Sequence, residues 1–186
     1  MTEHAMPSLG DILDFWFDPE NKSAWFKASP EMDEEIRLRF EGLWQQAADG
    51  SLNHLIKDAS SALAMVILLD QFPLNMYRDD GIRYSTADAA AKITRRAIQA
   101  GWDEELGNEQ KAFLYMPLMH SEKLVDQDLS IACYEKAGLQ ENLRFARHHR
   151  DIVKRFGRFP HRNQALGRES TPKEQAYLDS KEAFKA

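Results

Sequence analysis

The residue types that could do chemistry are concentrated near the C-terminus of this 186-residue chain. Between positions 155 and 163, arginines alternate with two phenylalanines, a glycine and a proline, and a His-Arg-Asn triplet closes the run. The phenylalanines should anchor the backbone in a core, while Gly157 and Pro160 restrict its path. We therefore predict a rigid loop that holds cationic and hydrogen-bonding groups in place, either as an anion site or as a structural ion-pair network.

The candidate ligand-binding residues lie in this loop, shortly after it, and in two segments that precede it. They are His161, Arg162, Asn163, Arg168, His149, Arg150, His120 and Glu122. Arginine side chains bind carboxylates and phosphates through two parallel hydrogen bonds, so we expect an anionic ligand. Within the loop, Arg158 should be structural because it lies between two phenylalanines beside a helix end. Arg162 and Arg168 should face the ligand.

Asp70 is a further candidate because it lies near the end of the most apolar segment of the chain. The helix dipole and burial both disfavour a carboxylate there, so it needs a cationic or hydrogen-bonding partner. The candidate partners are Arg78, Arg150, Arg158 and Arg162. We assign Asp70, Gln71, Arg78 and Arg158 to a supporting ion-pair network, in which Arg158 pairs with Asp70 or Glu122. A structural salt bridge and a carboxylate that orients a ligand-binding arginine or histidine both remain open.

The candidate histidines have both a structural and a catalytic interpretation. His149 lies within the apolar stripe of its predicted helix, as a core histidine does. His120 shares a face with Phe113, and Ser121 and Glu122 follow it directly. This arrangement predicts a polar cluster at a helix end.

Patterns that identify common metal, cofactor and nucleophile sites are absent from the sequence. The possible metal ligands do not occur at H-E-x-x-H, H-x-x-E-H or paired Glu-x-x-His spacing, and there is no G-x-S-x-G, Walker or Rossmann glycine pattern. Cys133 lies among apolar residues, as a core cysteine does. We therefore predict no metal and no cofactor.

Composition narrows the classes of partner. Acidic residues predominate in 1–50 and basic residues in 144–168. These segments either neutralise each other or form an electropositive site. The chain has a net charge of −6 and a pI near 5.5, whereas proteins that bind nucleic acid carry a broad basic surface. We therefore predict no nucleic-acid partner. The absence of an 18-residue apolar run and of a signal peptide, with one cysteine, predicts a cytoplasmic protein without a membrane partner. The oligomeric state is not predicted.

Helical signals run through the whole chain, and strand signals are nearly absent. Predicted helices cover 8–17, 29–49, 59–72, 86–100, a segment starting at Asn108, then 122–136, 141–156 and 171–184. Serine or threonine caps begin several of them, and glycines follow several ends. Pro73 is expected to end the central helix, since the residue before proline is biased away from helix. We predict one all-α domain over residues 1–186, with seven to eight helices packed as antiparallel hairpins.

Five phrases together are distinctive, and they occupy residues 12–17, 67–73, 115–122, 149–163 and 166–171. They resemble a bacterial family known only as a domain of unknown function, and the resemblance covers nearly the whole chain. It implies an all-helical, tetratricopeptide-like superhelix and supplies no established activity, substrate or cofactor. One departure is Leu74, at a position where family members often carry arginine.

Three functions are compatible with these residues. The first is a helical binding protein with a polar groove for an anionic small molecule or an acidic peptide end. The second is a small-molecule hydrolase, in which His149, His120 or His161 is the acid or base and Asp70 or Glu122 orients it. The third is a structural scaffold, which would have all its arginines internally paired.

Overall fold

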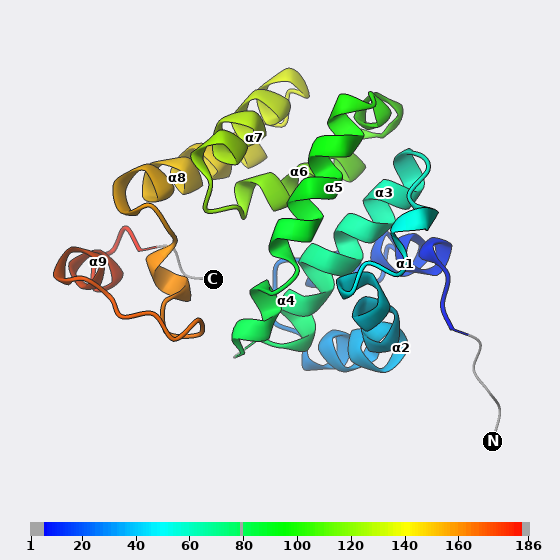
Figure 1. The fold of residues 1–186 in the computed structure, drawn as a ribbon, viewed down its shortest axis with the longest axis horizontal. Coiled ribbons are helices and arrows are strands. Elements are labelled where there is room, and N and C mark those ends of the chain that lie inside the picture. The colour runs from blue at the N-terminus through cyan, green and yellow to red at the C-terminus, as the bar shows by residue number, and fades with distance from the viewer. Residues whose placement is uncertain (1–5, 79, 184–186) are drawn as a thin grey trace.

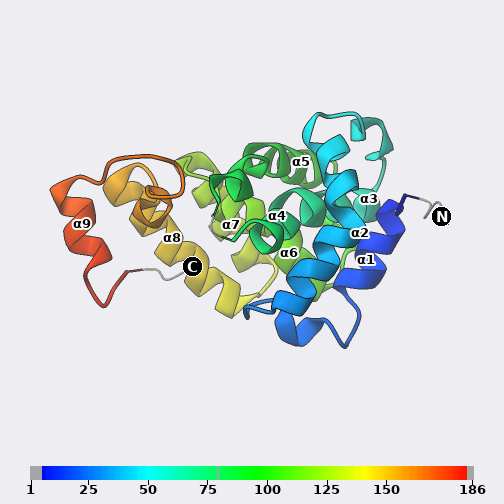
Figure 2. The same cartoon turned by 90° about the horizontal axis from the view of Figure 1, so that it is seen from below.

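The computed structural model describes residues 6–78 and 80–183, and all regular structure in these residues is helical (Figure 1). This confirms the predicted all-α class. The α-helices are α1 (Leu9–Trp16), α2 (Pro30–Ala48), α3 (Ala59–Val66), α4 (Phe72–Met76), α5 (Ala87–Gln99), α6 (Asn108–Met119), α7 (Leu124–Lys136), α8 (Gln140–Phe156) and α9 (Pro172–Leu178). Helix α5 packs against α6, α6 against α7, and α7 against α8, as helical hairpins do. Figure 2 shows α9 at one end of the molecule and α1 near the other.

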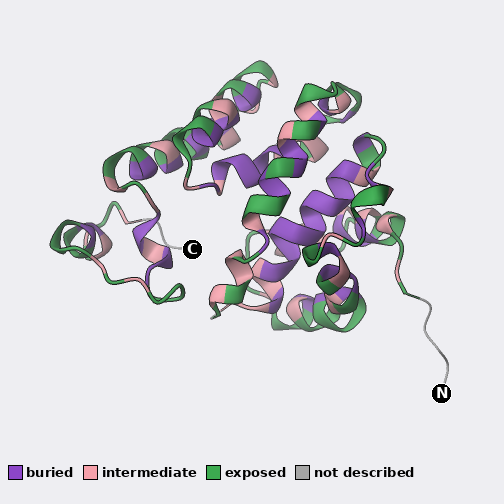
Figure 3. Ribbon diagram, viewed as in Figure 1, coloured by how far each residue is buried: buried purple, intermediate pink, exposed green. Residues whose placement is uncertain are grey.

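The centre of the fold is a continuous helical run made of α3, a π-helical turn at Ile67–Gln71, and α4. By length and composition this run, Ala59–Met76, could cross a membrane, but 83% of it is buried inside the protein. Figure 3 shows the same burial along α3 and α4. Apolar residues on nearly every side thus make this the core helix, against which α1, α2, α5 and α6 pack.

The prediction that Pro73 ends the central helix is wrong. Pro73 has no N–H for the carbonyl of Leu69, which lies four residues earlier. A π-helical turn accommodates the proline: its hydrogen bonds span five residues, and the N–H of Phe72 donates to the carbonyl of Ile67. The hydroxyl of Thr86 donates a hydrogen bond to the Leu69 carbonyl, for which Pro73 supplies no N–H, at 2.6 Å. The helix therefore continues because a residue from a distant segment replaces the missing donor.

Local signals place most of the other boundaries. Ser8, Ser29 and Thr171 cap α1, α2 and α9 through their side chains, as their residue types indicate. Asn108 is the first residue of α6 rather than its cap, and α7 begins at Leu124 rather than at residue 122. Helix α9 ends at Leu178, and the predicted end at Phe184 lies outside the described residues.

Gly157 ends α8 in the left-handed conformation, with φ +73°, and its N–H donates to the carbonyl of Val153 at 2.7 Å. A Cβ built at Gly157 meets nothing within 4 Å, so any cost of a side chain there comes from the backbone alone. We expect Gly157→Val to lower the free energy of unfolding by about 1–2 kcal/mol in urea denaturation.

Gly42 provides the matched control, because it lies exposed in the middle of α2 and a Cβ there also meets nothing. Gly42→Ala should raise stability by about 0.5–1 kcal/mol. Equal effects of the two substitutions would contradict the left-handed cap.

Candidate functional site

The segment from Arg158 to Thr171 is held against three parts of the helical core. Its Pro160–Arg162 stretch is a short 3-10 helix. Phe159, which is fully buried, packs with Ile152 and Val153 of α8. The N–H of Phe159 donates to Glu122, in the α6–α7 connection, at 2.8 Å. The third part is the α4–α5 connection, where Gly81 lies close against the backbone of Ala165. The predicted rigid loop therefore lies where these elements meet.

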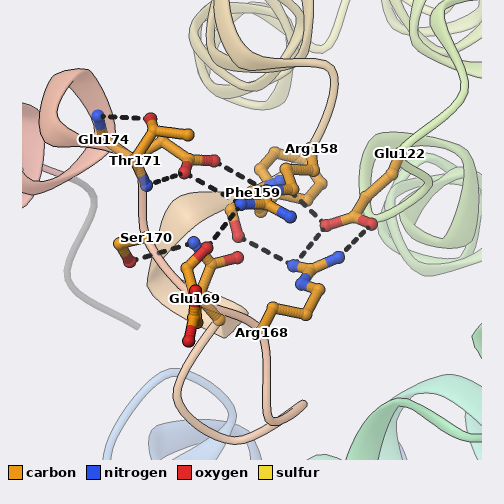
Figure 4. A network of polar contacts seen from close by, with 9 residues as sticks. Glu122, Arg158, Phe159, Arg168, Glu169, Ser170, Thr171 and Glu174 are labelled. Carbon is orange, nitrogen blue, oxygen red and sulfur yellow. Dashed lines mark hydrogen bonds and ion pairs between the residues drawn. The ribbon is translucent and has the colours of Figure 1, made fainter.

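Arg168 is paired inside the protein, so the prediction that it faces a ligand as an open cation is wrong. Its guanidinium donates to both oxygens of Glu122, at 2.8 and 3.0 Å, and to the Phe159 carbonyl at 3.1 Å (Figure 4). Burial would raise the pKa of Glu122, but the hydrogen bonds from Arg168 and Phe159 outweigh it and hold that pKa below its usual value. Glu122 and Arg168 therefore form an internal ion pair, and each neutralises the charge of the other.

Arg158 is structural, as predicted, but its partner is neither Asp70 nor Glu122. It donates to both oxygens of Glu174, at 2.7 and 2.9 Å, and to the Glu169 carbonyl at 2.8 Å (Figure 4). Glu174 also completes the capping box of α9 by accepting from the Thr171 N–H. The hydrogen bond from Arg158 lowers the pKa of Glu174 to about 2. This pair fixes α9 to the end of α8.

Two other predicted residues lie elsewhere. Arg150 pairs with Asp128 of α7 at 2.6 Å. Arg78 pairs with Asp33 of α2, with 2.7 Å between Nη2 and Oδ1. Neither contacts Asp70, so assigning Arg78 to the Asp70 network and Arg150 to the ligand site is wrong. Helical periodicity does not predict how neighbouring helices are aligned, and this alignment decides which charged residues meet.

Arg162 differs from all these arginines. It is 8% exposed, yet in the described residues its guanidinium has no carboxylate partner and no hydrogen-bond acceptor. Instead it stacks on the rings of Tyr84 and Phe159, with Cζ 4.6 and 4.5 Å from the two centroids. Burial lowers the pKa of Arg162, while nearby Tyr84, Glu122 and Asp70 act in the opposite direction. The protein thus holds a largely buried cation whose donors reach no acceptor among the described residues, and whose Nε is shielded from solvent as well.

Sequence reasoning missed the two residues from the α4–α5 connection that complete this environment. These residues are Arg83 and Tyr84. The guanidinium of Arg83 lies over the Tyr84 ring, with Cζ 5.2 Å from the ring centroid, and its Nε is buried without a partner. Among the described residues, the Arg83 side chain donates one hydrogen bond, from Nη1 to the Arg78 carbonyl, and no carboxylate pairs with it. We call Arg83, Tyr84, Phe159, His161 and Arg162 the Arg162 cluster. In the sequence, Asp80-Gly81 indicates a turn just before Arg83 and Tyr84, but it does not indicate that they contact Arg162.

The partner of Asp70 is a histidine rather than an arginine. His120, at the end of α6, places Nδ1 3.0 and 2.9 Å from the two Asp70 oxygens. Gln71, assigned to the same network, donates to Asp70 Oδ2 at 2.6 Å. The Asp70 side chain is 3% exposed and that of His120 is 20% exposed. A buried carboxylate therefore orients a histidine that reaches the surface.

The remaining candidates are His149 and Asn163, which are buried, and His161, which is half-buried. His149 places Nδ1 2.8 Å from the Phe145 carbonyl, and burial lowers its pKa to about 3. Burial and the adjacent Arg162 lower the pKa of His161 to about 4. Asn163 donates to the Ser170 hydroxyl at 3.1 Å, while its side-chain oxygen is buried without a partner. At neutral pH the net positive charge therefore comes from the arginines.

The wider surface offers less chemistry. One cavity of about 340 Å³ lies between α8 and α9, and another of about 310 Å³ lies beside α1 and α2. Neither is lined by the predicted ligand-binding residues. Within residues 6–78 and 80–183, no three His, Cys, Asp or Glu side chains are grouped so that they could hold a metal ion.

Comparison with known proteins places the chain in a family. Residues 12–182 match the family described as bacterial protein of unknown function (DUF924). The chain is also similar to the solved structure of a protein of unknown function, ATU0120, from Agrobacterium tumefaciens. The two are 37% identical, with a TM-score of 0.86, over 92% of this chain and 96% of that one. No match was found among curated proteins. From its sequence motifs and helical fold, the chain belongs to this bacterial family of unknown function.

Proposed function

We propose that the protein binds a small anionic molecule, or the acidic end of a peptide, at the Arg162 cluster. The observation that carries this proposal is the burial of Arg162 without an acceptor. Removing a charge from water costs several kcal/mol unless it is paired and hydrogen-bonded. Contacts with two ring faces offset only part of that cost, about 2 kcal/mol when desolvated. A carboxylate or phosphate from solution would supply the missing acceptors.

Comparison with the other arginines supports the proposal over a purely structural scaffold. Arg158 and Arg168 have bidentate carboxylate partners inside the protein, as a scaffold requires. Arg96 and Arg155 lack such partners but are exposed, so water satisfies them. Arg162 is both buried and unpaired among the described residues. Arg83 beside it adds a second cation to the same place.

The test is the thermal midpoint of wild type and Arg162→Met, with and without a panel of carboxylates and phosphates. Anions should stabilise the wild type, by about 2.7 kcal/mol at a hundred times the dissociation constant. Without anion, Arg162→Met should be as stable as wild type or more stable, because repulsion from Arg168 and Arg83 is relieved. The variant should gain no stability from anions.

Arg155→Met is the matched control. Arg155 also stacks on two rings, those of Phe156 and Tyr177, but it is exposed. This variant should keep the full anion effect. If Arg162→Met unfolds the protein and no anion stabilises the wild type, the cluster is structural and the scaffold function replaces this one.

A further inference from the structure

The contact between Asp70 and His120 has the geometry of a catalytic carboxylate–histidine pair. Asp70 lies in the π-helical turn of the core helix, and such turns are frequent at functional sites. Both carboxylate oxygens lie within 3.0 Å of His120 Nδ1. A carboxylate can only accept, so Nδ1 carries the proton and Nε2 carries the free lone pair. The pair fixes both the tautomer and the orientation of the ring.

The free nitrogen of His120 is available to a ligand. Nε2 forms no hydrogen bond with any described residue and is not among the buried unpartnered atoms, while the side chain is 20% exposed. His149 does not have this arrangement. It is 4% exposed and places Nδ1 against a backbone carbonyl.

The pair lies near the Arg162 cluster. Glu122, two residues after His120, accepts a hydrogen bond from the N–H of Phe159 in the cluster at 2.8 Å, and the charge of Asp70 raises the pKa of Arg162 against the effect of burial. The nucleophilic side chains of Ser121 and Cys133 are occupied or inert. The Ser121 hydroxyl donates to Asp126 at 2.7 Å, and burial raises the pKa of the Cys133 thiol to about 11. Water is therefore the nucleophile that His120 could activate.

We propose that His120 is the general base of an esterase site, with Asp70 as its positioning residue, for a small ester that carries a carboxylate of its own. This inference depends on the proposed function, because the Arg162 cluster binds that carboxylate. His120 Nε2 takes a proton from water as the water oxygen bonds to the ester carbonyl carbon. The carbon–oxygen bond to the alcohol then breaks, and the alcohol leaves with the proton from the imidazolium. The products are the acid and the alcohol.

The probe is the mono-4-nitrophenyl ester of succinic acid, compared with neutral 4-nitrophenyl acetate, with release of nitrophenolate as the readout. Wild type should hydrolyse the anionic ester faster than the neutral one. His120→Gln should lower kcat on the anionic ester by about a hundredfold or more. His54→Gln, at an exposed histidine without a carboxylate partner, should leave the rate unchanged.

Two further variants separate positioning from binding. Asp70→Asn keeps the shape of the side chain but favours the wrong tautomer, so kcat should fall at least tenfold while KM stays the same. Arg162→Met should raise KM for the anionic ester, because it removes the cation that binds the carboxylate. His120→Gln should still be stabilised by succinate, which shows that the variant folds and that the anion site is intact.

The outcomes distinguish the two proposals. If succinate stabilises the wild type but no hydrolysis exceeds the buffer rate, or if His120→Gln is as active as wild type, the esterase inference is wrong and anion binding stands. If succinate has no effect and the anionic ester is not preferred, the anion site fails as well. A loss of kcat in His120→Gln, with succinate binding retained, supports the inference.

Discussion

Replacing Arg158 by methionine is expected to lower the free energy of unfolding by about 3 kcal/mol, measured by urea denaturation at neutral pH. The loss arises from Glu174, whose side chain is 3% exposed and whose two oxygens both accept from Arg158. Without the arginine, the Glu174 carboxylate keeps only its contact with Thr171, whose N–H donates to it in the capping box of α9. A buried carboxylate without its cation is costly, and α9 loses its attachment to α8.

The same pair predicts how stability depends on pH. The folded-state pKa of Glu174 is about 2, below the usual value of 4.5, so its contribution is fully present above about pH 4.5. It should be lost as the pH falls from there toward 2. Wild type should therefore lose more stability across this window than Arg158→Met does. Equal slopes for the two proteins would show that Arg158 does not lower this pKa.

Two variants control for the loss of a cation as such. Arg150→Met removes an arginine whose partner Asp128 is 57% exposed, so stability should change by about 0–1 kcal/mol. Glu174→Gln in the Arg158→Met background keeps an acceptor for Thr171 but removes the stranded charge, so part of the loss should be recovered. A full effect in Arg150→Met would contradict the distinction between buried and exposed pairs.

Gly81→Ala is expected to lower stability by about 2–3 kcal/mol and to abolish stabilisation by anions. A Cβ at Gly81 would lie 2.3 Å from the Ala165 carbonyl oxygen and 3.2 Å from its carbonyl carbon. Both are backbone atoms, so one of the two segments must move. Gly81 lies three residues before Tyr84, and Ala165 three after Arg162. The movement should therefore separate the Tyr84 ring from the guanidinium that stacks on it.

The measurement is the thermal midpoint of Gly81→Ala with and without succinate, with Gly42→Ala as the glycine control that adds a Cβ in open space. Gly42→Ala should retain the full succinate effect. A Gly81→Ala protein that is as stable as wild type and still responds to succinate would show that the close approach of these two segments does not position the site.

The sequence alone determined the fold class and most helix boundaries, because these depend on interactions over a few residues. Ser8, Ser29 and Thr171 cap helices through hydrogen bonds to backbone three residues away. Gly157 ends α8 because glycine adopts positive φ at little cost. The helix end predicted at Pro73 was wrong because the donor that compensates for the proline is not local. Thr86, which donates to the Leu69 carbonyl, lies 17 residues away from it.

The tertiary structure decided which charged groups meet. The composition of the arginine-rich loop indicated cations in fixed positions, but the partner of each one depends on how distant segments pack. Arg168 pairs with Glu122 across 46 residues and Arg158 with Glu174 across 16, whereas Arg162 stacks on Tyr84. Any carboxylate in the chain has the right charge for any arginine. Only the packing of α6, α8 and the α4–α5 connection determines which ones come within hydrogen-bond reach, and which arginine is buried without one.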